Sequence, residues 1–174
     1  MTRHALALLV TLLTFQQATV LADDGPAKDV PELQALSNYL GTWDVAITSQ
    51  DSPFAKGEST SKWILDGKFV QQTGSVTSAD GTTVLKITTL MTYDRRKKAY
   101  RMWSFLSDGT ATESSGKWDE KDQTMTSVRR GDGTTTTTTA KFAEGRIENW
   151  TIVTTNQNNE VVGTFSGTNT RRKQ

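Results

Sequence analysis

The chain has 174 residues, with 20 basic and 19 acidic side chains, no cysteine, and a single histidine, His4. A formal net charge of +1 excludes binding of nucleic acid by net charge alone. Without cysteine there are no disulfides and no thiol nucleophile, so packing and hydrogen bonds must hold the fold.

Residues 1–22 have the pattern of an export signal. Arg3 precedes an apolar run over residues 5–13, and small residues precede a predicted cleavage site after Ala22. The apolar run is shorter than the ~20 residues that cross a bilayer. We therefore expect a periplasmic or secreted protein without membrane insertion. Residues 23–32 are polar and are expected to form a flexible leader.

Residues 33–174 are predicted to form one domain, beginning with a short helix before Gly41. Leu33, Leu36 and Leu40 recur there at helical spacing. Downstream, alternating segments separated by Asp-Gly or Glu-Gly pairs predict strands joined by tight turns. The ten predicted strands span residues 42–50, 57–65, 68–76, 83–93, 97–106, 110–118, 122–130, 134–142, 146–155 and 160–171.

The short connections between these segments favour sequential antiparallel pairing. Closure would remove the two exposed edges that such a long meander otherwise leaves. The alternative, an open two-layer sandwich, normally uses longer crossing connections, and we find none in the sequence. We expect an all-β fold, a single closed up-and-down antiparallel barrel of about ten strands with a short N-terminal helix.

Residues in the first and last predicted strands support closure. Leu40-Gly41-Thr42-Trp43, together with Arg171 and Arg172, resembles the calycin arrangement of lipocalins and nitrobindin-like barrels. There a Gly-x-Trp opens the barrel and a cation from the last strand covers the indole, a favourable cation–π geometry. The resemblance implies that Trp43 and Arg171 close the barrel.

Further segments, at residues 63–69, 91–94 and 116–119, resemble the exported bacterial domain-of-unknown-function family 1579. This resemblance spans residues 34–172 and implies a calycin-like barrel, but it brings no activity or binding residues. Nitrobindin-like proteins hold haem through a histidine, whereas His4 lies in the predicted export signal. We therefore expect no haem, no other cofactor and no metal.

Aromatic residues and a cation on one predicted strand suit a pocket wall. Trp103 shares a face with Arg101 and Phe105, because residues two apart in a strand point the same way. The alternative is that the tryptophans of the chain are core or barrel plugs. The predicted ligand-binding residues are Arg101, Trp103, Phe105, Glu113 and Trp150.

Six consecutive threonines, Thr134 to Thr139, put hydroxyls on both faces of one strand. In a closed barrel they would line part of the lumen, and segments 85–93 and 103–105 would supply apolar wall. Such a lumen suits an amphipathic ligand or ordered water. Alternatively, threonine simply fills exposed strand positions, or the run forms an outward array that binds polysaccharide or ice.

Carboxylates inside predicted strands leave an enzymatic alternative open. A pair drawn from Glu58, Glu113 and Glu148 across the lumen could act as acid and base in a hydrolase or isomerase. These carboxylates could equally face solvent or pair with arginines, for which Arg101, Arg129 and Arg146 are available. There is no Gly-x-Ser-x-Gly motif and no phosphate-binding loop.

The sequence thus predicts an exported barrel that holds a small, partly apolar or amphipathic molecule non-covalently in its lumen. The alternatives are the carboxylate-dependent enzyme and an extracellular interaction module whose barrel is filled by side chains. We expect no nucleic-acid partner, and a monomer or weak dimer.

Overall fold

The structure, a computed structural model, describes residues 25–50, 52–144 and 146–173. The predicted export signal lies outside these residues. One 3-10 helix precedes ten strands, and each predicted strand overlaps one of them. The elements are η1 (Pro31–Tyr39), β1 (Gly41–Ile47), β2 (Phe54–Ile64), β3 (Phe69–Ser78), β4 (Val84–Asp94), β5 (Ala99–Leu106), β6 (Ala111–Asp119), β7 (Thr124–Gly131), β8 (Thr134–Ala143), β9 (Arg146–Thr155) and β10 (Val161–Arg171).

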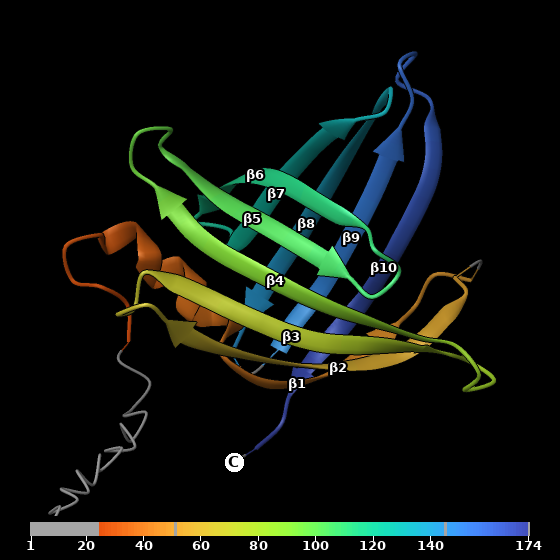
Figure 1. The fold of residues 1–174 in the computed structure, drawn as a ribbon, viewed down its shortest axis with the longest axis horizontal. Helices are drawn as coiled ribbons and strands as arrows, with labels where there is room; N and C mark the ends of the chain where they lie inside the picture. The colour runs from red at the N-terminus through yellow and green to blue at the C-terminus, as the bar shows by residue number, and fades with distance from the viewer. Residues whose placement is uncertain (1–24, 51, 145, 174) are drawn as a thin grey trace, which may run out of the picture.

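The strands form a closed antiparallel barrel in which each strand pairs with its sequence neighbours and β10 pairs with β1 (Figure 1). The closing ladder runs from Trp43 opposite Arg171 to Ile47 opposite Gly167. The predicted closed up-and-down barrel is therefore confirmed. Within the described residues, no helix combines the length and apolar composition needed to cross a bilayer.

The turn between β2 and β3 anchors the chain that precedes the helix. Gly67 has a φ of +72°, in the left-handed region that favours glycine. Its carbonyl accepts a hydrogen bond from the Ala27 amide at 3.0 Å, and Val30 is buried. The packed part of the chain therefore begins before residue 33, the residue at which the sequence pattern places the start of the domain.

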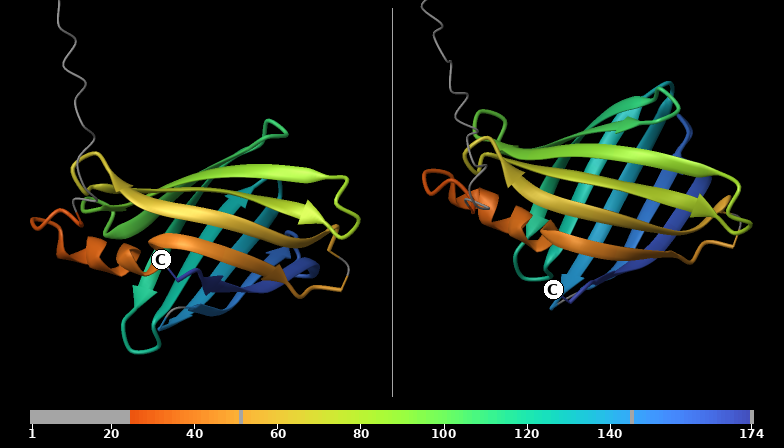
Figure 2. Two further views of the ribbon diagram at one scale, coloured as in Figure 1. Left: turned by 90° about the horizontal axis from the view of Figure 1, so that it is seen from below. Right: turned by 60° about the horizontal axis from the view of Figure 1, so that its bottom comes forward.

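Helix η1 lies across one end of the barrel (Figure 2). Leu33 and Leu36 are buried, and their spacing of three residues puts both on one face of a 3-10 helix. The Tyr100 hydroxyl donates to the Glu32 carbonyl at 2.7 Å, and the Trp43 indole N–H donates to the Tyr39 carbonyl at 2.8 Å. The helix and the first strand thus close this end together.

The pairing register decides which side chains face the lumen. Trp43 lies opposite Ser59, which lies opposite Gly74, and the same set of alternating positions continues around the barrel. The apolar core packs beside the helix, where Val70, Met91 and Met125 have side chains with at most 2% exposure. The remaining lumen lies between this core and the hairpins at the other end.

Candidate ligand-binding cavity

A cavity of about 300 Å³ lies inside the barrel and is lined by residues of every strand except β6. Three methionines line it together with aliphatic, aromatic and a few polar side chains. The principal side chains are Val45, Gln72, Val76, Ile87, Thr89, Met91, Met102, Met125, Ser127, Thr138, Ala140, Ile147, Trp150, Ile152, Phe165 and Asn169. The barrel interior is therefore not completely filled by its own side chains.

The methionines give this cavity an adaptable wall. Met91 and Met102 are direct cross-strand partners on β4 and β5, and Met125 lines the cavity from β7. Methionine has an unbranched, polarisable side chain that fills irregular space and reshapes around different contacts. An apolar molecule of suitable size would meet a surface able to adjust to its shape.

The wall of the cavity carries few polar groups, and several of them form hydrogen bonds with one another or with neighbouring side chains. The hydroxyls of Thr89 and Ser104 are 2.9 Å apart, and the Trp150 indole N–H donates to Asn169 Oδ1 at 2.8 Å. Ser127 and Thr138 are cross-strand partners and add hydroxyls. Pockets of this composition bind mainly by burying apolar surface, while a small number of polar groups fix the orientation.

Trp150 is the predicted ligand-binding residue that the structure brings to the lumen. Its ring packs against Phe165, with centroids 5.5 Å apart. Gly167 lies opposite Trp150 in the β9–β10 ladder, and a Cβ atom there would collide with the indole. The absence of a side chain at this position makes room for the ring on the cavity wall.

Arg101, Trp103 and Phe105 lie on the outer face of the barrel. Their strand neighbours Tyr100 and Met102 face inward. The expectation that Trp103 and Phe105 supply lumen wall is therefore wrong, and Phe105 is 47% exposed. A ligand-binding role for this outer group stays a prediction.

The outer group is built around the Arg101 guanidinium. Arg101 forms an ion pair with Glu113 on β6, lies 3.8 Å from an Asp94 carboxylate oxygen, and stands 5.6 Å from the Trp103 ring centroid. Only 12% of the Arg101 side chain is exposed. These contacts favour a role for Arg101 and Glu113 in holding β5 and β6 together.

The acid–base pair considered for an enzyme is not formed by Glu58 and Glu113. Glu58 lies opposite Asp44 on the outer face, where Arg172 Nη2 is 3.0 Å from its Oε2 atom. Glu113 pairs with Arg101 outside the barrel. The Glu148 side chain lies outside what the structure describes. The described lumen therefore offers no carboxylate pair for such chemistry.

The threonine run divides between the two faces of β8. Thr136 and Thr138 point inward, and their immediate neighbours point outward. Thr136 lies 3.1 Å from the Thr154 hydroxyl and accepts a hydrogen bond at 3.3 Å from Arg129. The predicted hydroxyls in the lumen are therefore present, but they share it with Arg129, which the sequence pattern does not place there.

At the helix end, the first and last strands are joined by an aromatic–cation contact. The Arg171 guanidinium carbon lies 4.6 Å from the Trp43 ring centroid, and Arg171 donates to the Asn38 carbonyl at 3.1 Å. Trp43 is 1% exposed. This contact joins the strands at the end of the barrel that the helix covers.

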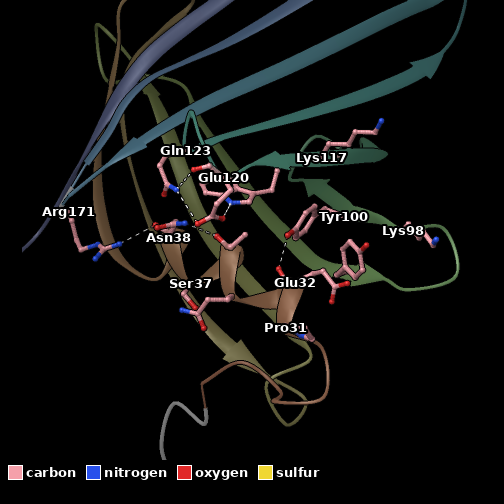
Figure 3. Close-up of a pocket in the computed structure, with 15 residues that line it drawn as sticks. Pro31, Glu32, Ser37, Asn38, Lys98, Tyr100, Lys117, Glu120, Gln123 and Arg171 are labelled. Carbon is pink, nitrogen blue, oxygen red and sulfur yellow. Dashed lines mark hydrogen bonds between the residues drawn. The ribbon is translucent and has the colours of Figure 1, made fainter.

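A second concave region, a groove of about 750 Å³, lies between η1 and the turns of β4–β7 (Figure 3). Several of its polar groups bond within it. Gln123 Nε2 donates to the Glu120 carbonyl at 2.7 Å, and the Trp118 indole donates to Glu120 Oε2 at 2.6 Å. Burial raises the pKa of Tyr100, also in this groove, to about 12, so its hydroxyl stays protonated. The groove thus largely follows the contact between the helix and the barrel.

The part of the chain that the structure describes contains no candidate metal site. No group of three or more histidine, cysteine, aspartate or glutamate side chains is gathered there. The cavity itself is lined mainly by apolar, hydroxyl and amide groups, and the carboxylate of Glu58, its one acidic lining residue, pairs with Arg172 on the outer face. Its chemistry fits non-covalent burial of an organic molecule.

The family model described as "Protein of unknown function (DUF1579)" matches residues 28–169, which span β1–β9 and most of β10. The chain belongs to this family. The family match includes the helix, the closing strands and every residue that lines the cavity. A comparison with curated proteins gave no match.

Proposed function

We propose that this family member binds a small, partly apolar molecule non-covalently inside its barrel after export to the periplasm or the cell exterior. The observation that carries the proposal is the interior cavity of about 300 Å³ with its largely apolar wall. That volume is at the lower end of the range for small-molecule sites, about 300–1,000 Å³. The ligand is correspondingly small.

Binding would be driven by removal of apolar ligand surface from water, at roughly 25 cal/mol per Å². The methionines Met91, Met102 and Met125 would adjust to the ligand, and Trp150 and Phe165 would supply flat aromatic contacts. The hydroxyls of Ser127 and Thr138 would orient its polar part. The protein would act as a monomer or weak dimer, because each barrel contains a whole cavity.

The threonine run supplies a matched pair of variants for testing this. Thr138→Phe places a ring in the cavity, whereas Thr137→Phe places the same ring on the outer face between Val128 and Val153. The probe is N-phenyl-1-naphthylamine, an uncharged dye whose fluorescence rises in apolar surroundings. Both variants are first checked for folding by circular dichroism and thermal unfolding.

We expect the wild-type protein and Thr137→Phe to bind the dye with similar affinity. Thr138→Phe should bind it at least about tenfold more weakly, a difference of about 1.4 kcal/mol. Absence of dye binding to the wild type, or equal binding by two folded variants, would count against a ligand site in the lumen.

A further inference from the structure

Arg129 is a charged side chain that the register places inside the barrel. It lies two residues from Ser127 on β7, so both point to the lumen. Its cross-strand partner Thr136 lies two residues from Thr138 on β8. Arg129 and Thr136 therefore form the layer next to the cavity, about 7 Å further toward the β7–β8 hairpin, at the end of the barrel opposite the helix.

The Arg129 guanidinium has no carboxylate partner among the described residues. Within the described part of the chain, its side chain forms one hydrogen bond, of 3.3 Å from Nη2 to Thr136 Oγ1. No inward-facing strand residue whose side chain is described is acidic. A guanidinium carries five N–H donors, so most of the donors of Arg129 are left for water or a ligand.

Other arginines of the barrel are engaged. Arg101 pairs with Glu113, Arg172 bridges Asp44 and Glu58, and Arg171 covers Trp43. Arg129 is partly buried in the layer next to an apolar cavity, where an uncompensated charge is costly. An anion bound there would offset that cost and would meet hydroxyls as well, since Thr154 lies 3.1 Å from Thr136.

We propose that the ligand of this cavity is an amphiphile with an anionic head group, and that Arg129 binds this group while the apolar part lies among the methionines. A carboxylate fits this site because its two oxygens match the fork of a guanidinium. Thr136 and Thr154 would contribute hydroxyls to the head group. The inference rests on the proposed function, since it specifies the ligand class of the same cavity.

The test compares two ligands that share one apolar chain. Decanoate carries a carboxylate, whereas decanol carries an uncharged hydroxyl, and both are measured by displacement of N-phenyl-1-naphthylamine. The variant is Arg129→Gln. Arg130→Gln is its matched control, because Arg130 is the next residue of β7, is exposed, and carries the same charge on the outer face. Direct dye binding by both variants shows that the cavity is intact.

We expect Arg129→Gln to weaken decanoate binding at least about tenfold, the loss expected for a hydrogen-bonded ionic contact. Decanol binding should change little, Arg130→Gln should bind both ligands like the wild type, and Arg129→Lys should restore part of the decanoate affinity. Added salt should weaken decanoate binding to the wild type more than decanol binding.

The outcomes separate this inference from the proposed function. Equal decanoate binding by the wild type and Arg129→Gln, with dye and decanol still bound, would overturn the anionic head group and leave the cavity as a ligand site. Failure of the wild type to bind dye, decanol and decanoate would overturn both proposals.

Discussion

Arg171 lies over the indole of Trp43, with its guanidinium carbon 4.6 Å from the ring centroid and the two residues directly opposite each other in the closing ladder. This contact joins the last strand to the first, and Arg171 also donates to the Asn38 carbonyl at the end of the helix. The side chain of Arg171 thus contributes both to closing the barrel and to holding the helix against it.

Replacement of Arg171 by alanine should lower the free energy of unfolding by about 1–2 kcal/mol, since it removes a cation–π contact and a hydrogen bond. The measurement is urea denaturation followed by tryptophan fluorescence. Lys173→Ala, which removes a nearby exposed charge beyond β10, is the control and should be neutral. Equal stabilities for both variants would show that the contact does not support closure.

A second link across the closing strands predicts a pH dependence. Arg172 lies 2.6 Å from an Asp44 oxygen and 3.0 Å from a Glu58 oxygen. The hydrogen bond from Arg172 holds the pKa of Asp44 below its ordinary value. A depressed folded-state pKa stabilises the protein above the unfolded-state pKa, and that contribution is lost as the pH falls through the folded-state value.

Wild-type stability should therefore fall more steeply than that of Asp44→Asn as the pH drops from about 5 toward 2. The urea midpoint measured across this range gives the comparison, and added salt should reduce the difference because the pair is exposed. Parallel curves for the two proteins would contradict a stabilising role of the bridge.

Gly67 should tolerate no side chain. Its φ is positive, and a Cβ atom would also collide with the carbonyl oxygen of Gly25. Gly81 has a similar φ of +76° but open space around it, so Gly81→Ala isolates the backbone strain, about 1–2 kcal/mol. Gly67→Ala should cost clearly more in thermal or urea unfolding. A cost no larger than that of Gly81→Ala would mean that the preceding chain is not held against this turn.

Arg101→Ala should lower stability without changing binding in the lumen. Arg101 lies outside the barrel, between Asp94 and Glu113 and beside Trp103. Its removal leaves Glu113 without that partner, so a fall in the midpoint temperature is expected, with dye affinity unchanged. The reverse pattern, with weaker dye binding and unchanged stability, would support the ligand-binding role that the sequence pattern suggested.

The sequence predicted the strands and their closure well because these depend on local signals. Acidic-glycine pairs mark several turns, and glycines such as Gly67 and Gly133 have the positive φ that such turns require. The inward face of β4 also followed from its alternation, since Ile87 and Met91 are apolar at alternate positions and line the cavity.

The inward face of β5 could not be read the same way, because both of its alternating sets contain large side chains. Tyr100 and Met102 form one set, and Trp103 belongs to the other. Pairing decided between them, since Tyr93 lies opposite Tyr100 and Met91 opposite Met102. A symmetric four-residue turn between Asp94 and Ala99 was the signal that could have given this register.

The inward position of Arg129 could not be predicted for a related reason. As a charged residue in a threonine- and serine-rich strand, it carries no sign of facing inward. Its place follows from the pairing of Ser127 with Thr138, which only the register of β7 against β8 reveals.

The central claim is that the barrel holds a small molecule, and native mass spectrometry of the protein purified from its own host tests it most directly. Wild-type protein and Thr137→Phe should carry an added mass that gentle activation removes, and that mass should be absent or much reduced in Thr138→Phe. A bare chain mass for the wild type, or the same added mass retained by Thr138→Phe, would contradict binding in the lumen.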